Sequence, residues 1–228
     1  RGPCSVVSRI TKLLFTMYAT FMTELSRFMV DAGIATHDSV RGCTDAEITE
    51  LERCLSIRLP VAMTACLRQM GHACGDFMDG DAFGIDAFTN ARGVALRITA
   101  AANSHWRLPE NAIPFLEHHG YEYLFVCADA GDDPPSWQYV ETEPDTQQRA
   151  LSFTAWLRES AIGAVEGTPW NDEVCREIGL HRDNWISRKK TLDEYYNEAG
   201  RIRKSLIARL IKNDLDRGRI SGSTELQE

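Results

Sequence analysis

The sequence predicts an α+β protein in which a mixed or antiparallel sheet packs against helices. Three observations lead to this prediction. Residues 44–70 have the apolar spacing and capping signals of helices, and residues 113–140 hold aromatic and β-branched segments separated by turn residues. Residues 151–157 then return to helical spacing. With 228 residues and 43% apolar content, the chain is long enough to bury a core.

The first helix of this region is predicted to begin at a capping box. Thr44 and Glu47 have the Thr-x-x-Glu spacing in which each residue satisfies the other's backbone amide. Leu59-Pro60 ends this helix and opens a second one over residues 62–70, because proline suits a first helical turn. Glu52 on the first helix is interpreted as a solvated carboxylate or as a cap to a neighbouring backbone amine.

The middle of the chain is predicted to form the sheet. Residues 83–88 resemble a short strand, and the alanine-rich residues 91–103 are predicted to be helical. Three further strands are expected at residues 113–116, 121–128 and 137–140, joined by tight turns that contain glycine, aspartate and proline.

Both ends of the chain are predicted to be helical, so we expect three parts: an N-terminal extension (1–43), a central domain (44–162) and a C-terminal extension (163–228). Residues 163–168 read as a linker, followed by a short helix over 171–179. A second capping box at Thr191 opens a long helix with a continuous apolar stripe, and a disordered tail is expected over 221–228.

Composition limits the function classes. No apolar run approaches the roughly 20 residues that a membrane span requires, and the seven cysteines show no spacing typical of a disulfide framework or a zinc site. The chain is therefore expected to be cytoplasmic, with reduced thiols. The central domain holds 18 acidic and 8 basic residues, a net charge of −10, which argues against a general nucleic-acid binder.

Motifs for catalysis or cofactor binding are missing from the sequence. It contains no nucleophile elbow, no phosphate-binding glycine loop and no His-Glu-x-x-His, so we expect no enzyme, no cofactor and no metal. Glu117, His118 and His119, with Cys127 or Asp129, could in principle hold a metal. Adjacent side chains on a strand point to opposite sides, however, so a polar turn is the preferred interpretation.

The acidic residues of the loops fall into two sequence groups. Asp76, Asp79 and Asp81 have a spacing similar to that of a calcium loop, but the glutamate that such a loop requires is missing. Together with Asp129, Asp132 and Asp133 they are interpreted as an exposed acidic surface.

The order of the predicted pieces in residues 44–162 resembles the SUKH superfamily, which includes yeast cell-wall-synthesis regulators and bacterial immunity proteins. The residues that carry the resemblance are Ile48, Leu51-Glu52, Leu59-Pro60, Phe83-Gly84-Ile85, Ile113-Pro114-Phe115, Ser152-Phe153 and Trp156-Leu157. The segment His118-His119-Gly120 and the last 65 residues depart from the pattern. The resemblance implies an immunity protein that neutralises a cognate toxin, often a nuclease, by binding it.

The acidity of the central domain fits this implication, because nuclease toxins are commonly basic where they hold phosphate. The partner-binding candidates are therefore the six aspartates above, with Trp106 and Trp137 as aromatic anchors. Two alternatives stay open: a regulatory scaffold that binds a cellular enzyme, and a DNA-binding regulator that uses residues 171–215, where the pattern is only similar to a helix-turn-helix.

Overall fold

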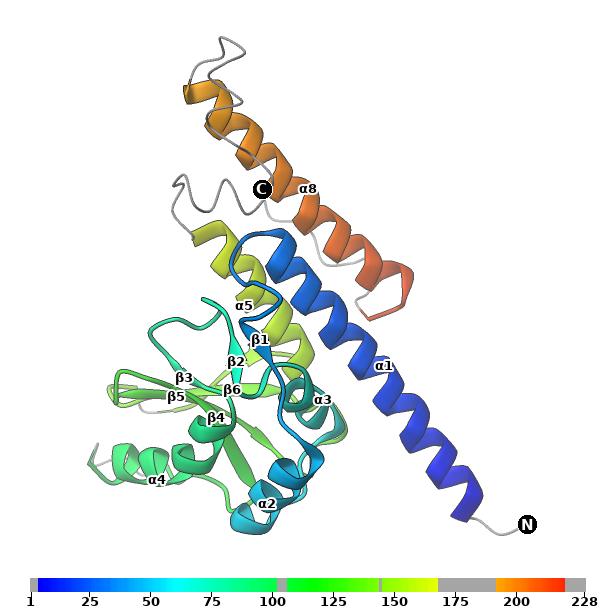
Figure 1. Cartoon of the computed structure of the whole chain (residues 1–228). Coiled ribbons are helices and arrows are strands. Elements are labelled where there is room, and N and C mark those ends of the chain that lie inside the picture. The colour runs from blue at the N-terminus through cyan, green and yellow to red at the C-terminus, as the bar shows by residue number, and fades with distance from the viewer. Residues whose placement is uncertain (1–3, 102–105, 144, 168–191, 220–228) are drawn as a thin grey trace.

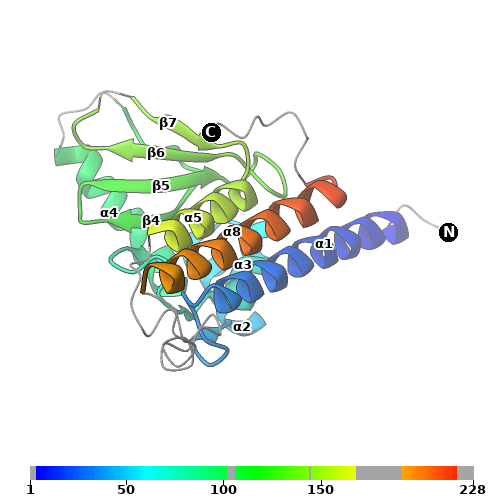
Figure 2. The ribbon, with the colours of Figure 1, turned by 90° about the horizontal axis from the view of Figure 1, so that it is seen from above.

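The computed structural model describes residues 4–101, 106–143, 145–167 and 192–219. It confirms the α+β fold: a five-stranded antiparallel sheet lies beside a layer of long helices (Figure 1). Seen from above, α5, α8 and α1 lie next to one another on one side of the sheet (Figure 2).

The sheet is a meander in which every neighbouring pair of strands is antiparallel. Its strands, in spatial order, are β3 (Ala82–Phe83), β4 (Ala112–His118), β5 (Glu122–Cys127), β6 (Ser136–Val140) and β7 (Gln147–Ala150). The three predicted strands over residues 113–140 are thus confirmed as β4, β5 and β6. The β4–β5 hairpin turns at His119 and Gly120, whose φ angles of 48° and 81° suit a tight turn.

Both faces of the sheet are buried. On β5, Leu124 and Val126 face the main core under α5, while Tyr123 and Phe125 face a second, aromatic cluster beside α4. This alternation follows from the two-residue period of a strand.

The prediction of a strand over residues 83–88 is wrong beyond Phe83. Gly84 has a φ of 95°, and α4 (Ile85–Ala101) begins at the next residue. A Cβ on Gly84 would lie 2.7 Å from the carbonyl oxygen of Gly71, so the chain can turn there only without a side chain. The buried side chains that follow have helical spacing: Phe88, Ala91, Ala95 and Ile98.

The helical pair α2 (Asp45–Leu55) and α3 (Val61–Met70) forms as predicted. Both hydrogen bonds of the capping box are present, from Glu47 N to Thr44 Oγ1 and from Thr44 N to Glu47 Oε2. Glu52 Oε1 accepts a hydrogen bond from Leu59 N at 2.8 Å, so of the two interpretations of Glu52 the backbone cap is the one that the structure shows. This carboxylate therefore holds the bend between the two helices.

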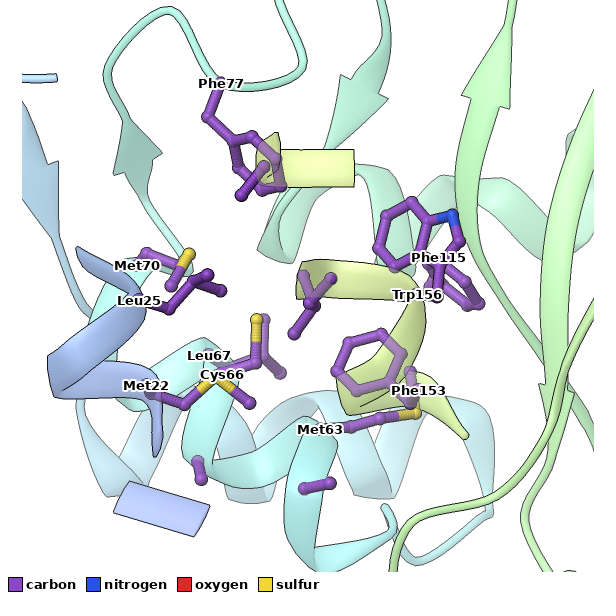
Figure 3. Close-up of a cluster of buried hydrophobic side chains, with 14 of the residues drawn as sticks. Met22, Leu25, Met63, Cys66, Leu67, Met70, Phe77, Phe115, Phe153 and Trp156 are labelled. Atoms are coloured by element: carbon purple, nitrogen blue, oxygen red, sulfur yellow. The ribbon is translucent and has the colours of Figure 1, made fainter. Parts of the chain in front are cut away.

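The N-terminal helix α1 (Cys4–Asp31) is integral to the core rather than peripheral. It packs against α3, and four of its large side chains are almost fully buried: Phe21, Met22, Leu25 and Met29. Side chains from α1, α3, α5 and β4 meet in one apolar cluster (Figure 3). A two-stranded sheet of β1 (Val40–Arg41) and β2 (Ala73–Cys74) joins the segment after α1 to the segment after α3.

Helix α5 (Phe153–Gly167) continues through most of the predicted linker, so a linker over residues 163–167 is wrong. Val165 is fully buried, and the carbonyl oxygen of this residue accepts a hydrogen bond from Arg203 at 2.9 Å.

The division of the chain into three domains remains a prediction. The short helix over 171–179, the cap at Thr191 and the tail over 221–228 lie outside the described residues.

Helix α8 (Leu192–Asp216) is held against α1 and α5 by buried charges. Asp214 is fully buried and pairs with Arg158 of α5 at 3.2 Å and with Arg219 Nε at 2.9 Å. Arg219 also pairs with Glu24 of α1 at 2.5 Å. Burial raises the pKa of the Asp214 carboxyl despite these two arginines. Within the described parts of the chain, no helix has the length and apolarity of a membrane span.

Candidate functional site

A groove of about 480 Å³ opens at the turn end of the β4–β5 hairpin. The loop over residues 76–81 forms one wall, and the second half of α5 forms the other. The floor is apolar and includes Phe77, Leu116 and Trp156. The ionisable side chains that line it are Asp76, Asp79, Asp81, His118, Glu122 and Arg149. Acidic groups therefore outnumber basic ones, and we call this feature the acidic groove.

The loop over residues 76–81 owes its shape to two successive tight turns. Asp79 N donates to the carbonyl of Asp76 at 3.1 Å, and Asp81 N donates to that of Met78 at 3.0 Å. Met78 and Gly80 have positive φ angles of 65° and 87°. Phe77 is 1% exposed and anchors the loop in the core, so Asp76 and Asp79 are left exposed beside it.

His118 closes one end of the acidic groove by hydrogen bonding to Asp81 through Nδ1. This hydrogen bond raises the pKa of the His118 imidazole above its ordinary value of 6.5, and the charges of Asp81, Glu122 and Glu117 act in the same direction. The pair thus ties the end of β4 to the acidic loop. Next to it, Glu122 accepts a hydrogen bond from Gln138 at 2.5 Å.

The structure does not bring the six predicted aspartates together. Asp129, Asp132 and Asp133 follow β5, at the end where Ala112 pairs with Cys127, whereas the acidic groove lies where His118 pairs with Glu122. The seven residues of β4 separate these ends by roughly 20 Å at about 3.3 Å per residue. We call Asp129, Asp132 and Asp133 the exit group.

Members of the exit group make contacts that hold the fold. Asp129 accepts a hydrogen bond from Asn111, and the backbone carbonyl of Asp132 accepts one from Ala62 N, at the start of α3. The Asp133 carboxylate accepts hydrogen bonds from Thr154 N at 2.9 Å and from Thr154 Oγ1 at 2.5 Å, and so caps α5. Burial raises the pKa of Asp133 in spite of these bonds.

The two predicted aromatic anchors lie on the other face of the sheet from the acidic groove. Both are half-buried and pack on the second cluster. Trp106 stacks on Tyr139 with ring centroids 5.0 Å apart, and Trp137 pairs across strands with Phe125. A partner in the acidic groove therefore does not reach them from the same side.

The residues that the sequence offered as metal ligands at the β4–β5 hairpin also lie apart from one another. His118 faces Asp81, and Glu117 accepts a hydrogen bond from Gly120 N in the turn. Cys127 and Asp129 lie at the opposite end of β5.

Among the charged residues of the acidic groove, Glu122 and Arg149 were not singled out from the sequence. Glu122 lies directly opposite His118 in the β4–β5 register, so correct pairing of the hairpin would have placed it beside the groove. Arg149 comes from β7, and no local pattern around it indicates that its side chain reaches the groove.

Several basic side chains of α8 that a DNA-binding role would use already have partners within the protein, one of them buried and two at the surface. Arg203 is 4% exposed and donates to Val165 O, Arg201 pairs with Glu198, and Arg209 pairs with Asp31. The segment over 174–188 that resembles a helix-turn-helix lies outside the described residues. The described part of this region thus adds no support for a DNA-binding face.

Comparison with known families identifies a family over the central part of the chain. Residues 42–159 match the SMI1/KNR4 family (SUKH-1), which covers slightly more than half of the chain. This match begins and ends within three residues of the domain predicted at 44–162. A search of curated proteins gives no match. Family membership supports an immunity-like or regulatory role in general, and the protein belongs to the SMI1/KNR4 (SUKH-1) family.

Proposed function

We propose that this protein is an immunity protein that binds a cognate bacterial toxin and neutralises it by association, without catalysis. The observation that carries the proposal is the family match over residues 42–159. Neutralisation by association depends on a binding surface rather than on a catalytic constellation.

The acidic groove is the surface that we assign to this binding. It combines an apolar floor with four carboxylates and two basic groups, so it suits the stem and the charged head of a partner's arginine or lysine. A nuclease toxin is basic where it holds phosphate, and an acidic surface accelerates encounter with such a partner. This reasoning favours a nuclease as the toxin.

The proposal is tested by reading the genes that neighbour this one and, where a toxin domain is encoded there, by expressing that domain. Co-expression should protect cells from that toxin, and the two purified proteins should form a complex of defined stoichiometry that abolishes the toxin's activity. A complex that leaves the toxin fully active would contradict neutralisation and favour the regulatory scaffold. Absence of both protection and binding would contradict the immunity role for that pair.

A further inference from the structure

Three potential metal-binding side chains from separate parts of the chain converge near the start of α2. Cys43 precedes this helix, Glu47 lies in its first turn, and His72 follows α3. Their Sγ, carboxylate oxygen and imidazole nitrogen all lie within 4.8 Å of one another. None of these three residues lines the acidic groove.

Main-chain hydrogen bonds anchor Cys43 and His72, and the capping box anchors the Glu47 carboxylate through Oε2. Cys43 N donates to Leu67 O at 2.8 Å, and His72 N donates to Arg41 O at 2.9 Å. Glu47 uses Oε2 in the capping box, which leaves Oε1 facing His72 Nε2 at 2.9 Å. The three donors are therefore pre-positioned, which is what a metal site requires of its ligands.

The space that the Cys43 sulfur occupies exists because residue 71 is a glycine. A Cβ on Gly71 would lie 2.4 Å from Cys43 Sγ, so a side chain at position 71 would collide with the thiol. Cys43 is 7% exposed, while the side chains of His72 and Glu47 are 38% and 41% exposed. The cluster thus has a buried sulfur at its base and an open side through which an ion can enter.

We propose that Cys43, Glu47 and His72 form a zinc-binding site in which the three side chains supply sulfur, oxygen and nitrogen and a water molecule completes a tetrahedron. Zinc accepts this mixture of ligands, whereas calcium and magnesium prefer oxygen alone. Binding replaces the thiol proton of Cys43 with the metal and releases that proton to solvent. The ion would connect the start of α2 to the end of α3.

The competing explanation is that Glu47 and His72 form only a surface ion pair beside a buried structural cysteine. The two explanations differ in what they require of Cys43, because an ion pair does not involve the thiol. A metal that reports on its sulfur ligand therefore separates them. Cobalt(II) does so, since a thiolate ligand gives it a charge-transfer absorption in the near ultraviolet.

The test uses the full chain, freed of metal with a chelator and kept reduced, and titrates it with cobalt(II) and then zinc. We expect one equivalent of cobalt with thiolate charge transfer, bleached when zinc displaces it. Cys43→Ser should abolish this absorption, and His72→Ala should weaken binding by about tenfold or more. Cys54→Ser changes an exposed cysteine of α2 outside the cluster and should bind as the unaltered chain does.

Circular dichroism of each variant checks that the fold is retained. If a Cys43 variant is unfolded, His72→Ala alone decides, since His72 is exposed and can be replaced with little effect on packing. The proposal is overturned if the unaltered chain shows no thiolate-to-cobalt absorption, or if that absorption persists in Cys43→Ser. Neither result bears on toxin binding, because the acidic groove shares no residue with this cluster.

Discussion

At the turn end of the β4–β5 hairpin, Asp76 and Asp79 are exposed on a loop beside a groove. At the opposite end, the half-buried Asp133 carboxylate caps the start of α5. Both ends carry three aspartates that look alike in the sequence. The turn end combines these charges with a hollow and an apolar floor, whereas members of the exit group make contacts within the fold.

The difference shows that an acidic count does not by itself define a binding face. A carboxylate that satisfies a helix terminus contributes to stability and is committed to that role, while an exposed carboxylate beside a groove acts mainly on the approach of a partner. Substitutions at the two ends should therefore change different properties of the protein.

The largest effect on stability is expected for Asp133→Ala. This change leaves the Thr154 amide at the start of α5 without its acceptor, and we expect a loss of about 2 kcal/mol in the free energy of unfolding. Asp133→Asn retains an oxygen acceptor and should lose less. Urea denaturation monitored by circular dichroism measures both values.

Asp132→Ala is the matched control for this substitution. The Asp132 side chain is exposed and only its backbone carbonyl bonds to Ala62, so its removal should change stability by no more than about 0.5 kcal/mol. Equal effects at positions 132 and 133 would contradict the view that the Asp133 carboxylate is a structural cap.

Loss of the Asp81 carboxylate should change the pKa of His118, with a smaller effect on the protein than the loss of the Asp133 cap. The hydrogen bond to Asp81 raises this pKa, so the stabilisation from the pair is fully present below the unfolded value of about 6.5 and is lost as the pH rises through the folded value. Asp81→Asn should lower the pKa of His118, whereas Asp79→Asn should leave it nearly unchanged. Titration of the imidazole signals by NMR measures the shift, and an unchanged pKa in Asp81→Asn would contradict the pairing.

Local sequence patterns predicted the elements that are stabilised by residues close to one another in the chain. The capping box at Thr44 and Glu47 and the three strands over residues 113–140 depend on neighbours in the chain, and both were predicted. The cap formed by Glu52 was one of two interpretations that the sequence left open. The strand over 83–88 failed because its alternating apolar residues are too few to exclude a helix. Helical burial becomes visible only further along, at Ala91 and Ala95.

The candidate sites depended on contacts between distant residues, which the sequence did not supply. Asp81 meets His118 across 37 positions, and His72 meets Glu47 across 25. The placement of Trp137 on the same face as Tyr139 follows from strand alternation, but the stacking of Trp106 on Tyr139 follows from no regular pattern in the sequence.

The rate of association with the toxin at two salt concentrations tests most directly whether the turn end of the hairpin is the binding end. The Asp76→Asn/Asp79→Asn double variant should associate several-fold more slowly at low salt, and rising salt should slow the unaltered protein more than this variant, because charges beyond a Debye length of about 8 Å are screened. The Asp129→Asn/Asp132→Asn double variant removes the same charge at the other end and should associate nearly as fast as the unaltered protein. Equal slowing by both double variants, or rates that respond neither to salt nor to substitution, would contradict the assignment of the acidic groove as the toxin-binding surface.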